Sequence, residues 1–190
     1  MYYHASQVKG IQVLEPRISN HNIPLVYFST KRENTLVYLS NAVEKYCKES
    51  GFQYNGAWSK WGPYGFDKDG ILKIEEYYPN ALEETYKGVT GYIYSSADVA
   101  IDTDFKLQIP DAVVSRNETP VTDCEYIDNA YTELIKAEQQ GLIRIVSYKD
   151  FIAKREGWLK AVINEEYRNA TEHPEYQYFL EAKFSKYLEK

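Results

Sequence analysis

The stretch LVYFSTKRENTLVYLSNAVEKYCKESG, residues 25–51, carries the most informative pattern of this 190-residue chain. It begins with a compact apolar run, residues 25–29, which is typical of a buried strand. Thr30 and Glu33 then have the spacing of a helix capping box, in which a hydroxyl and a carboxylate satisfy free backbone N–H groups. Apolar residues follow at helical spacing. The stretch therefore predicts a strand that leads into a helix over 33–48. The residues expected to be buried in that helix are Leu36, Leu39 and Val43.

The rest of the chain alternates short apolar runs with amphipathic stretches, and no linker or repeat divides it. Strands are expected at 2–6, 10–14, 71–75, 91–95, 105–109, 112–115 and 142–148. Helices are expected at 79–88, 128–140, 149–169 and 174–188. We therefore expect an α+β fold, in which a curved and mainly antiparallel sheet is flanked by helices. Residues 1–148 are expected to form the core, and the helices of 149–190 to pack on the same domain.

Composition narrows the range of functions. No apolar run approaches the ~18 residues of a membrane-spanning helix, and the first residues lack the pattern of a signal peptide. Two cysteines are too few for a disulfide scaffold, which favours reduced thiols and a cytoplasmic location. The net charge is −6 and basic residues do not cluster, so the sequence shows no strong signature of nucleic-acid binding.

Several kinds of site are disfavoured by their missing motifs. The three histidines are far apart, and none belongs to a pattern of metal ligands. There is no phosphate-binding glycine loop and no G-x-S-x-G nucleophile elbow. Cys47 falls on the apolar side of its expected helix, where a cysteine is usually structural.

Two short segments remain that carry a recognisable pattern. The first is YHAS at residues 3–6, and the second is VYFST at residues 26–30, with Tyr38 eleven residues after Tyr27. Together they resemble the His-Tyr-Glu branch of the ADP-ribosyltransferase fold, which includes poly(ADP-ribose) polymerases, diphtheria-type toxins and RNA 2′-phosphotransferases. The resemblance covers about the first 45 residues and one short segment downstream.

The resemblance implies NAD as the cofactor and assigns roles to individual residues. His4 and Ser6 would bind the cofactor in the first strand, with His4 at the ribose hydroxyls. Tyr27 and Tyr38 would sandwich the nicotinamide ring, where a cationic ring on an aromatic face gains about 1 kcal/mol. Glu125 would be the catalytic carboxylate, since CEYI at residues 124–127 is similar to the family's Asn-Glu-Tyr-Ile segment. Glu118 is the alternative.

This chain departs from the family pattern at two positions. The glycine that follows the family's histidine, and whose backbone holds the carboxamide, is Ala5 here. Glu125 is also followed almost directly by an expected helix, whereas the family's glutamate starts or sits in a strand.

Two functions of different classes are therefore expected. The first is NAD-dependent ADP-ribosyl transfer, or nucleotide binding by an inactive relative. The second is a non-catalytic interaction with a protein partner through the aromatic-rich segment 58–64 and the tyrosine-rich C-terminal helix. The two differ in one structural requirement, because a transferase needs His4, Tyr27 and Tyr38 around one cleft.

Overall fold

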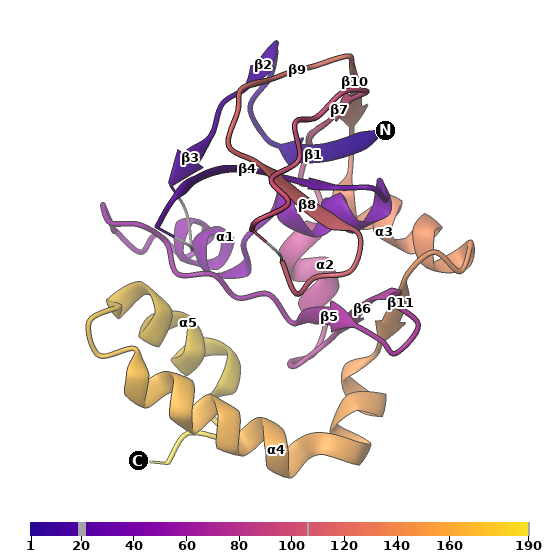
Figure 1. Cartoon of the computed structure of the whole chain (residues 1–190). Coiled ribbons are helices and arrows are strands. Elements are labelled where there is room, and N and C mark those ends of the chain that lie inside the picture. Colours follow the sequence, from indigo (N-terminus) through magenta and orange to yellow (C-terminus); the bar gives the residue numbers. More distant parts are fainter. Residues whose placement is uncertain (19–21, 106, 190) are drawn as a thin grey trace. The chain divides into compact units, whose positions relative to one another are not determined.

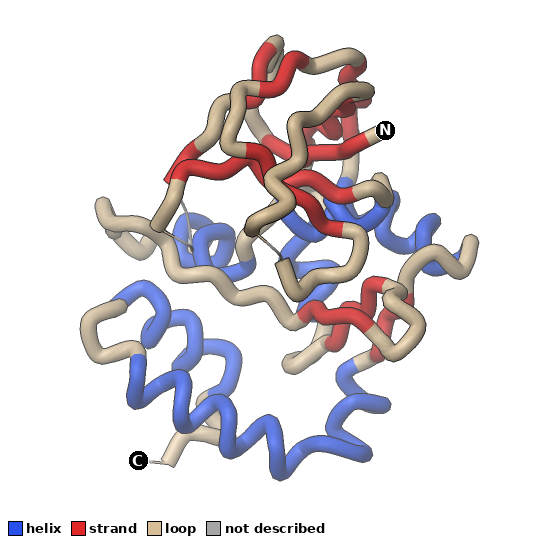
Figure 2. Tube along the Cα trace, in the orientation of Figure 1, coloured by secondary structure: helices blue, strands red, loops and turns tan. Residues whose placement is uncertain are grey.

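Antiparallel strands and helices are distributed over two compact units of the chain. The computed structural model, shown in Figure 1, describes residues 1–18, 22–105 and 107–189. The first unit consists of Met1–Leu39, Gly65–Lys73 and Tyr86–Arg144, and the second of Ser40–Tyr64, Ile74–Thr85 and Ile145–Lys190. The first unit contains most of the strands, and the second is mainly helical, as Figure 2 shows. The expected α+β class is therefore confirmed.

The main sheet of the first unit has the order β10-β7-β1-β4-β3, and β8 also pairs with β4. Its strands are β1 (Tyr2–Ser6), β3 (Arg17–Ile18), β4 (Pro24–Ser29), β7 (Gly91–Ser96), β8 (Ala112–Ser115) and β10 (Asp123–Ile127). All of these pairings are antiparallel. A separate pair is formed by β2 (Val13–Leu14) and β9 (Thr119–Pro120). The strand that resembles the family's first motif, β1, thus lies beside the strand of the second motif, β4.

The register assigns the side chains of this sheet to two faces, because successive residues of a strand point to opposite sides. His4 is opposite Tyr94, and the pairing of Tyr3 with Ser29 places His4 opposite Phe28. We call this side the histidine face. The other side carries Ala5 and the residue opposite it on β7, Ile93. We call it the helix face, since two helices cover it.

The helices of the helix face are η1 (Glu33–Leu39), a 3₁₀ helix, and α3 (Ala130–Gln139). Both pack in the first unit, and η1 lies against β1, β4 and β7. Leu39 comes so near the sheet that a Cβ built on Gly91 would lie 2.6 Å from its Cδ2 atom. A Cβ at Gly91 would therefore require the end of the Leu39 side chain to move, and it would also lie 3.2 Å from the backbone oxygen of Ser6.

The predicted helix over 33–48 is in fact two helices. The 3₁₀ helix η1 ends at Leu39, and α1 (Ala42–Glu49) starts after Asn41, whose side chain accepts a hydrogen bond from the Val43 N–H. The capping box is not formed, because Thr30 Oγ1 donates instead to Asp111. The three residues predicted to be buried, Leu36, Leu39 and Val43, are buried. The pattern gave the buried side correctly and missed the break.

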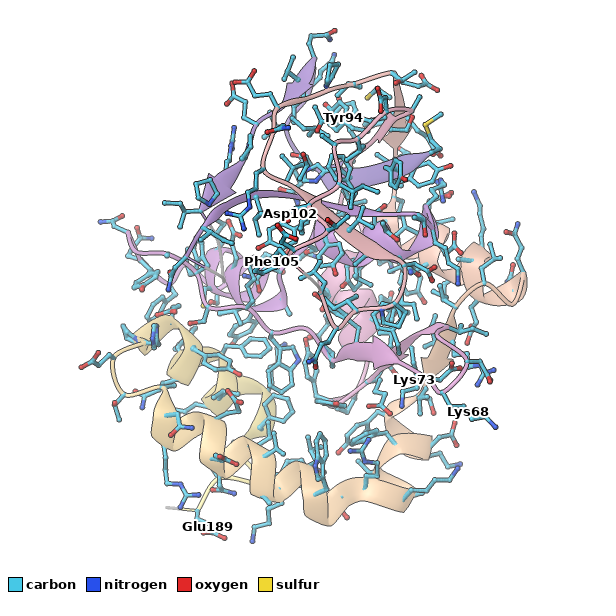
Figure 3. The ribbon with its side chains drawn as sticks, in the orientation of Figure 1. Lys68, Lys73, Tyr94, Asp102, Phe105 and Glu189 are labelled. Atoms are coloured by element: carbon cyan, nitrogen blue, oxygen red, sulfur yellow. The ribbon has the colours of Figure 1, made fainter. Side chains whose placement is uncertain are left out.

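Most other elements agree with the sequence within a few residues. The helices of the second unit are α1, α2 (Ala81–Tyr86), which ends at the boundary, α4 (Tyr148–Asn169) and α5 (Pro174–Phe184). The short strands β5 (Tyr64–Phe66), β6 (Leu72–Glu75) and β11 (Arg144–Val146) form a sheet of order β11-β6-β5. The strand predicted at 105–109 is not observed in its described residues, and Lys106 lies outside them. There the carboxylate of Asp102, labelled in Figure 3, accepts from the backbone N–H groups of Asp104 and Phe105 and forms a turn.

The second unit is built around an aromatic core. Phe179, Phe184 and Phe151 are fully buried there, together with Leu159 and Ile163 of α4. Residues from α1 and α2 join the same cluster. The C-terminal helices therefore share a core with 40–64 and 74–85, segments that the sequence had assigned to the core over 1–148. A sequence pattern does not reveal such discontinuous units, because their members meet only in three dimensions.

Candidate functional site

The imidazole of His4 is the best-defined polar group of the predicted site. Its Nδ1 atom lies 2.9 Å from the backbone oxygen of Tyr27, which is an ordinary hydrogen-bond distance. A carbonyl oxygen only accepts, so Nδ1 must carry the hydrogen and Nε2 is left as the acceptor of the neutral ring. The structure shows no hydrogen bond from a described residue to Nε2. The two motif strands are thus linked through a histidine of defined tautomer.

The protonation state of His4 follows from its surroundings. Burial lowers the pKa of His4, and the positive charge of Arg17 acts in the same direction. The hydrogen bond to the Tyr27 carbonyl opposes the shift, but the pKa still falls below its ordinary value of 6.5. At neutral pH the ring is therefore uncharged, and Nε2 offers a lone pair to a donor such as a hydroxyl group.

Aromatic side chains surround His4 on the histidine face. The ring of Phe28 meets the imidazole edge-on, with centroids 6.3 Å apart. Tyr94, labelled in Figure 3, is fully buried, and its hydroxyl donates to the backbone oxygen of Val8 at 2.7 Å. Phe28 and Tyr94 belong to one cluster of buried side chains. The histidine face is therefore a packed surface in which the partly exposed His4 supplies a polar group.

The other residues predicted to bind the cofactor lie around the same strands. Ser6 ends β1, and its hydroxyl accepts a hydrogen bond from the Val8 N–H at 3.1 Å. Tyr27 lies within β4 opposite Val114 of β8, and its side chain belongs to the helix face. Tyr38 is on η1, which covers the helix face, and 52% of its surface is exposed. The structure thus brings the backbones of His4 and Tyr27 together and directs their side chains to opposite faces.

Glu125 is held in an ion pair on β10. Its carboxylate is bound by Arg32 at two points, Oε2 by Nε at 2.7 Å and Oε1 by a terminal nitrogen at 2.6 Å. The same Arg32 nitrogen lies 3.0 Å from Glu133 on α3. The residue predicted to be catalytic is therefore in mid-strand, with both carboxylate oxygens bound by a guanidinium group.

The register also separates Glu125 from His4. Glu125 is opposite Ile93, and Ile93 is opposite Ala5, so Glu125 shares the helix face with Tyr27. His4 is on the histidine face, two strands away. The alternative carboxylate, Glu118, is exposed in the connection between β8 and β9. Neither placement tests the catalytic role, which stays a prediction.

Sequence reasoning missed Arg32 as a partner of the predicted catalytic residue. Arg32 and Glu125 are 93 positions apart, and nothing in either local pattern links them. The one available signal was the position of Arg32 between the strand over 25–29 and the following helix. Such a position places a long cation beside the end of β4, although it does not name the carboxylate that binds it.

The two cysteines differ in burial, and the described residues contain no group of potential metal ligands. Cys47 is buried, and burial raises the pKa of its thiol to about 11, which makes it a poor nucleophile. Cys124 is exposed on β10. Among the described residues, no three or more His, Cys, Asp or Glu side chains are grouped so that they would hold a metal ion. No helix within the described ranges has the length and apolar character needed to cross a bilayer.

The aromatic residues assigned to a protein partner are used within the second unit. Trp61 packs on Phe184 with ring centroids 5.1 Å apart and on Phe179 at 5.9 Å. Tyr178 of α5 stacks on Phe52 at 4.6 Å. These contacts account for the aromatic surplus of both segments by packing inside one unit.

Comparisons with protein-family models, with curated proteins and with solved structures found no match for this chain.

Proposed function

We propose that the first unit binds a nucleotide of the NAD type and that His4 accepts a hydrogen bond from one of its ribose hydroxyls. The observation that carries this proposal is the bond between His4 Nδ1 and the Tyr27 carbonyl. This bond fixes the tautomer of His4, so that the neutral ring presents Nε2 as an acceptor. His4 lies on β1, the strand whose sequence resembles the family's first motif. A ribose hydroxyl is a donor that matches this acceptor.

We propose nucleotide binding ahead of ADP-ribosyl transfer, because transfer has a further requirement. Cleavage of the bond between nicotinamide and ribose needs a carboxylate beside the positive charge that develops on the sugar. Glu125 is engaged by Arg32 and lies on the face opposite His4. A ligand held by His4 therefore does not meet Glu125 in this conformation. ADP-ribosyl transfer through Glu125 requires a rearrangement that releases this carboxylate.

The protein-interaction function is the second candidate. It was motivated by segment 58–64 and the tyrosines of α5, and these side chains pack on the core of the second unit. That packing removes the reason to reserve them for a partner. Nucleotide binding is therefore proposed on the His4 to Tyr27 bond alone, since the side chains of Tyr27 and Tyr38 lie on the helix face and do not join His4 around one cleft.

The test is thermal unfolding with and without NAD. A ligand at ~100 times its dissociation constant stabilises the native state by about 2.7 kcal/mol. His4→Asn is the informative variant, because the asparagine amide nitrogen replaces Nδ1 as donor to the Tyr27 carbonyl while Nε2 is lost. We expect the variant to fold and to lose the NAD-dependent increase in Tm.

Two exposed tyrosines provide a matched comparison for the stacking role. Tyr38 and Tyr126 are exposed to 52% and 54%. Tyr126 is opposite Tyr92, which is opposite Ser6, so Tyr126 shares the histidine face with His4, whereas Tyr38 lies over the helix face. With a ligand bound at His4 Nε2, we expect Tyr126→Ala to reduce the increase in Tm and Tyr38→Ala to leave it unchanged. An equal response of wild type and His4→Asn to NAD, or no response of the wild type at millimolar NAD, rejects the proposed function.

A further inference from the structure

The second unit contains a small pocket that none of the assigned roles uses. It has a volume of about 220 Å³ and is lined by residues of the chain before β5, of α4 and of α5. The lining residues are Lys60, Trp61, Gly62, Pro63, Val162, Glu166 and Tyr176. Pockets for drug-sized ligands usually measure about 300–1,000 Å³, so this pocket is suited to a smaller molecule.

One wall of the pocket is aromatic and held in place by the core. Trp61 contacts Phe179 and Phe184 on the core side, and its ring centroid is 6.4 Å from that of Tyr176. Pro63 and Val162 add apolar surface to the lining. The wall is therefore preorganised to receive an apolar group without rearrangement.

The polar groups of the pocket have unused hydrogen-bonding capacity. The indole Nε1–H of Trp61 is buried and has no hydrogen-bond partner among the described residues. Lys60 is exposed and makes no ion pair with any residue that the structure describes. Glu166 Oε2 accepts a hydrogen bond from the Tyr176 hydroxyl at 3.0 Å, and a carboxylate has further acceptor positions. Lys60 and Glu166 thus bring one cationic donor and one anionic acceptor to the lining, while the Trp61 N–H lies beneath the surface of the aromatic wall.

We propose that this pocket binds a small zwitterion, namely a free α-amino acid with an apolar side chain. Its carboxylate accepts a hydrogen bond from Lys60, and its ammonium group donates to Glu166. Its side chain lies against the rings of Trp61 and Tyr176. A simple anion is disfavoured because Glu166 repels it, and a simple cation is disfavoured because Lys60 repels it.

The experiment follows the indole Nε1–H signal of Trp61 by two-dimensional NMR of the full chain, assigned with Trp61→Phe. The common amino acids are titrated one at a time. N-acetyl-leucine, which lacks the ammonium group, and leucinamide, which lacks the carboxylate, are the matched probes. We expect a saturable shift of this signal with leucine or another apolar amino acid, and no saturation with either blocked derivative.

Charge-neutral variants test the two ionic contacts. Lys60→Gln and Glu166→Gln should each weaken binding about tenfold, the typical consequence of losing one charge-assisted hydrogen bond. Lys154→Gln and Glu165→Gln change exposed charges on α4 that do not line the pocket, and they should leave the affinity unchanged. The proposal is overturned if no amino acid gives a saturable shift at millimolar concentration. It is also overturned if the blocked derivatives bind as well as leucine.

Discussion

Ser59→Ala is expected to destabilise the second unit through a carboxylate on α5 that is fully buried. Glu175 has no exposed surface, and its Oε1 accepts from the Ser59 hydroxyl at 2.7 Å and from the Ser59 backbone N–H at 3.2 Å. The substitution removes the hydroxyl donor and leaves the backbone donor. A hydrogen bond to a charged group contributes about 1.5–3 kcal/mol. The variant should therefore lose about 2 kcal/mol of unfolding free energy at pH 7.

The destabilisation caused by Ser59→Ala should become smaller as the pH falls. Burial raises the pKa of Glu175, but the hydrogen bonds from Ser59, from its own backbone N–H and from Tyr54 together outweigh it, and the pKa falls below its ordinary value. A carboxyl group with a lowered pKa in the folded state stabilises that state above its unfolded pKa of about 4.3, and the contribution is lost as the pH falls further. The difference between wild type and Ser59→Ala should therefore shrink below about pH 4.3.

The assay is urea denaturation of both proteins at several pH values. In a chain of this length 1 kcal/mol corresponds to about 2–4 °C, so thermal unfolding at pH 7 should show a decrease in Tm of about 4–8 °C. Ser185→Ala is the matched control, since that exposed serine at the end of α5 should change stability by less than about 0.5 kcal/mol. Equal destabilisation by Ser59→Ala at pH 7 and at a pH well below about 4.3, or none beyond the control, refutes the reasoning.

Three further predictions concern Arg32, Cys124 and His4 of the first unit. The second of them compares Cys124 with Cys47 of the second unit. Arg32→Ala should lower stability by about 1 kcal/mol, measured by denaturation, because the pair with Glu125 is bidentate but partly exposed; a neutral result means that this pair contributes nothing. In the native protein a thiol reagent at pH 8 should modify exposed Cys124, whereas Cys47, buried and with its pKa raised to about 11, should react only on unfolding. Mass spectrometry distinguishes the two, and labelling of Cys47 at the same rate contradicts the prediction. The unfolded chain protonates His4 near pH 6.5, and the folded chain does so at lower pH, so stability should fall as pH drops below about 6.5. His4→Asn should reduce that dependence, and an unchanged pH profile argues against a buried neutral ring.

The sequence was most informative where local chemistry decides the structure. The apolar run before Ser29 became β4, and the amphipathic stretch after Asp128 became α3. It failed at the break between η1 and α1, because the side chain of Asn41 caps α1 and also donates to the backbone oxygen of Ser59 at 2.8 Å. The second of these bonds depends on a segment 18 residues away, which no helical periodicity reveals.

In the candidate site, too, the sequence pattern did not reveal long-range contacts. Both motif segments were expected to be strands of one sheet, and β1 and β4 are paired in it and linked by the His4 to Tyr27 bond. The face on which each side chain lies depends on register, and a shift of one residue would reverse it. Register is set by long-range pairing, here between β1 and β7 and between β7 and β10. Local motifs could therefore suggest Glu125 as a candidate for the site but could not determine its face.

The separation of His4 from Glu125 has a consequence for any chemistry at this site. Neighbouring strands are about 4.8 Å apart, so β10 lies roughly 10 Å from β1 across the intervening β7. The two side chains also project from opposite sides of the sheet. A ribose bound to His4 Nε2 is thus beyond reach of the Glu125 carboxylate unless β10 moves or the ligand passes around an edge. Binding and turnover should then respond to different substitutions, since His4→Asn affects the bound ligand directly, whereas Glu125→Gln breaks the ion pair with Arg32 and leaves the histidine face intact.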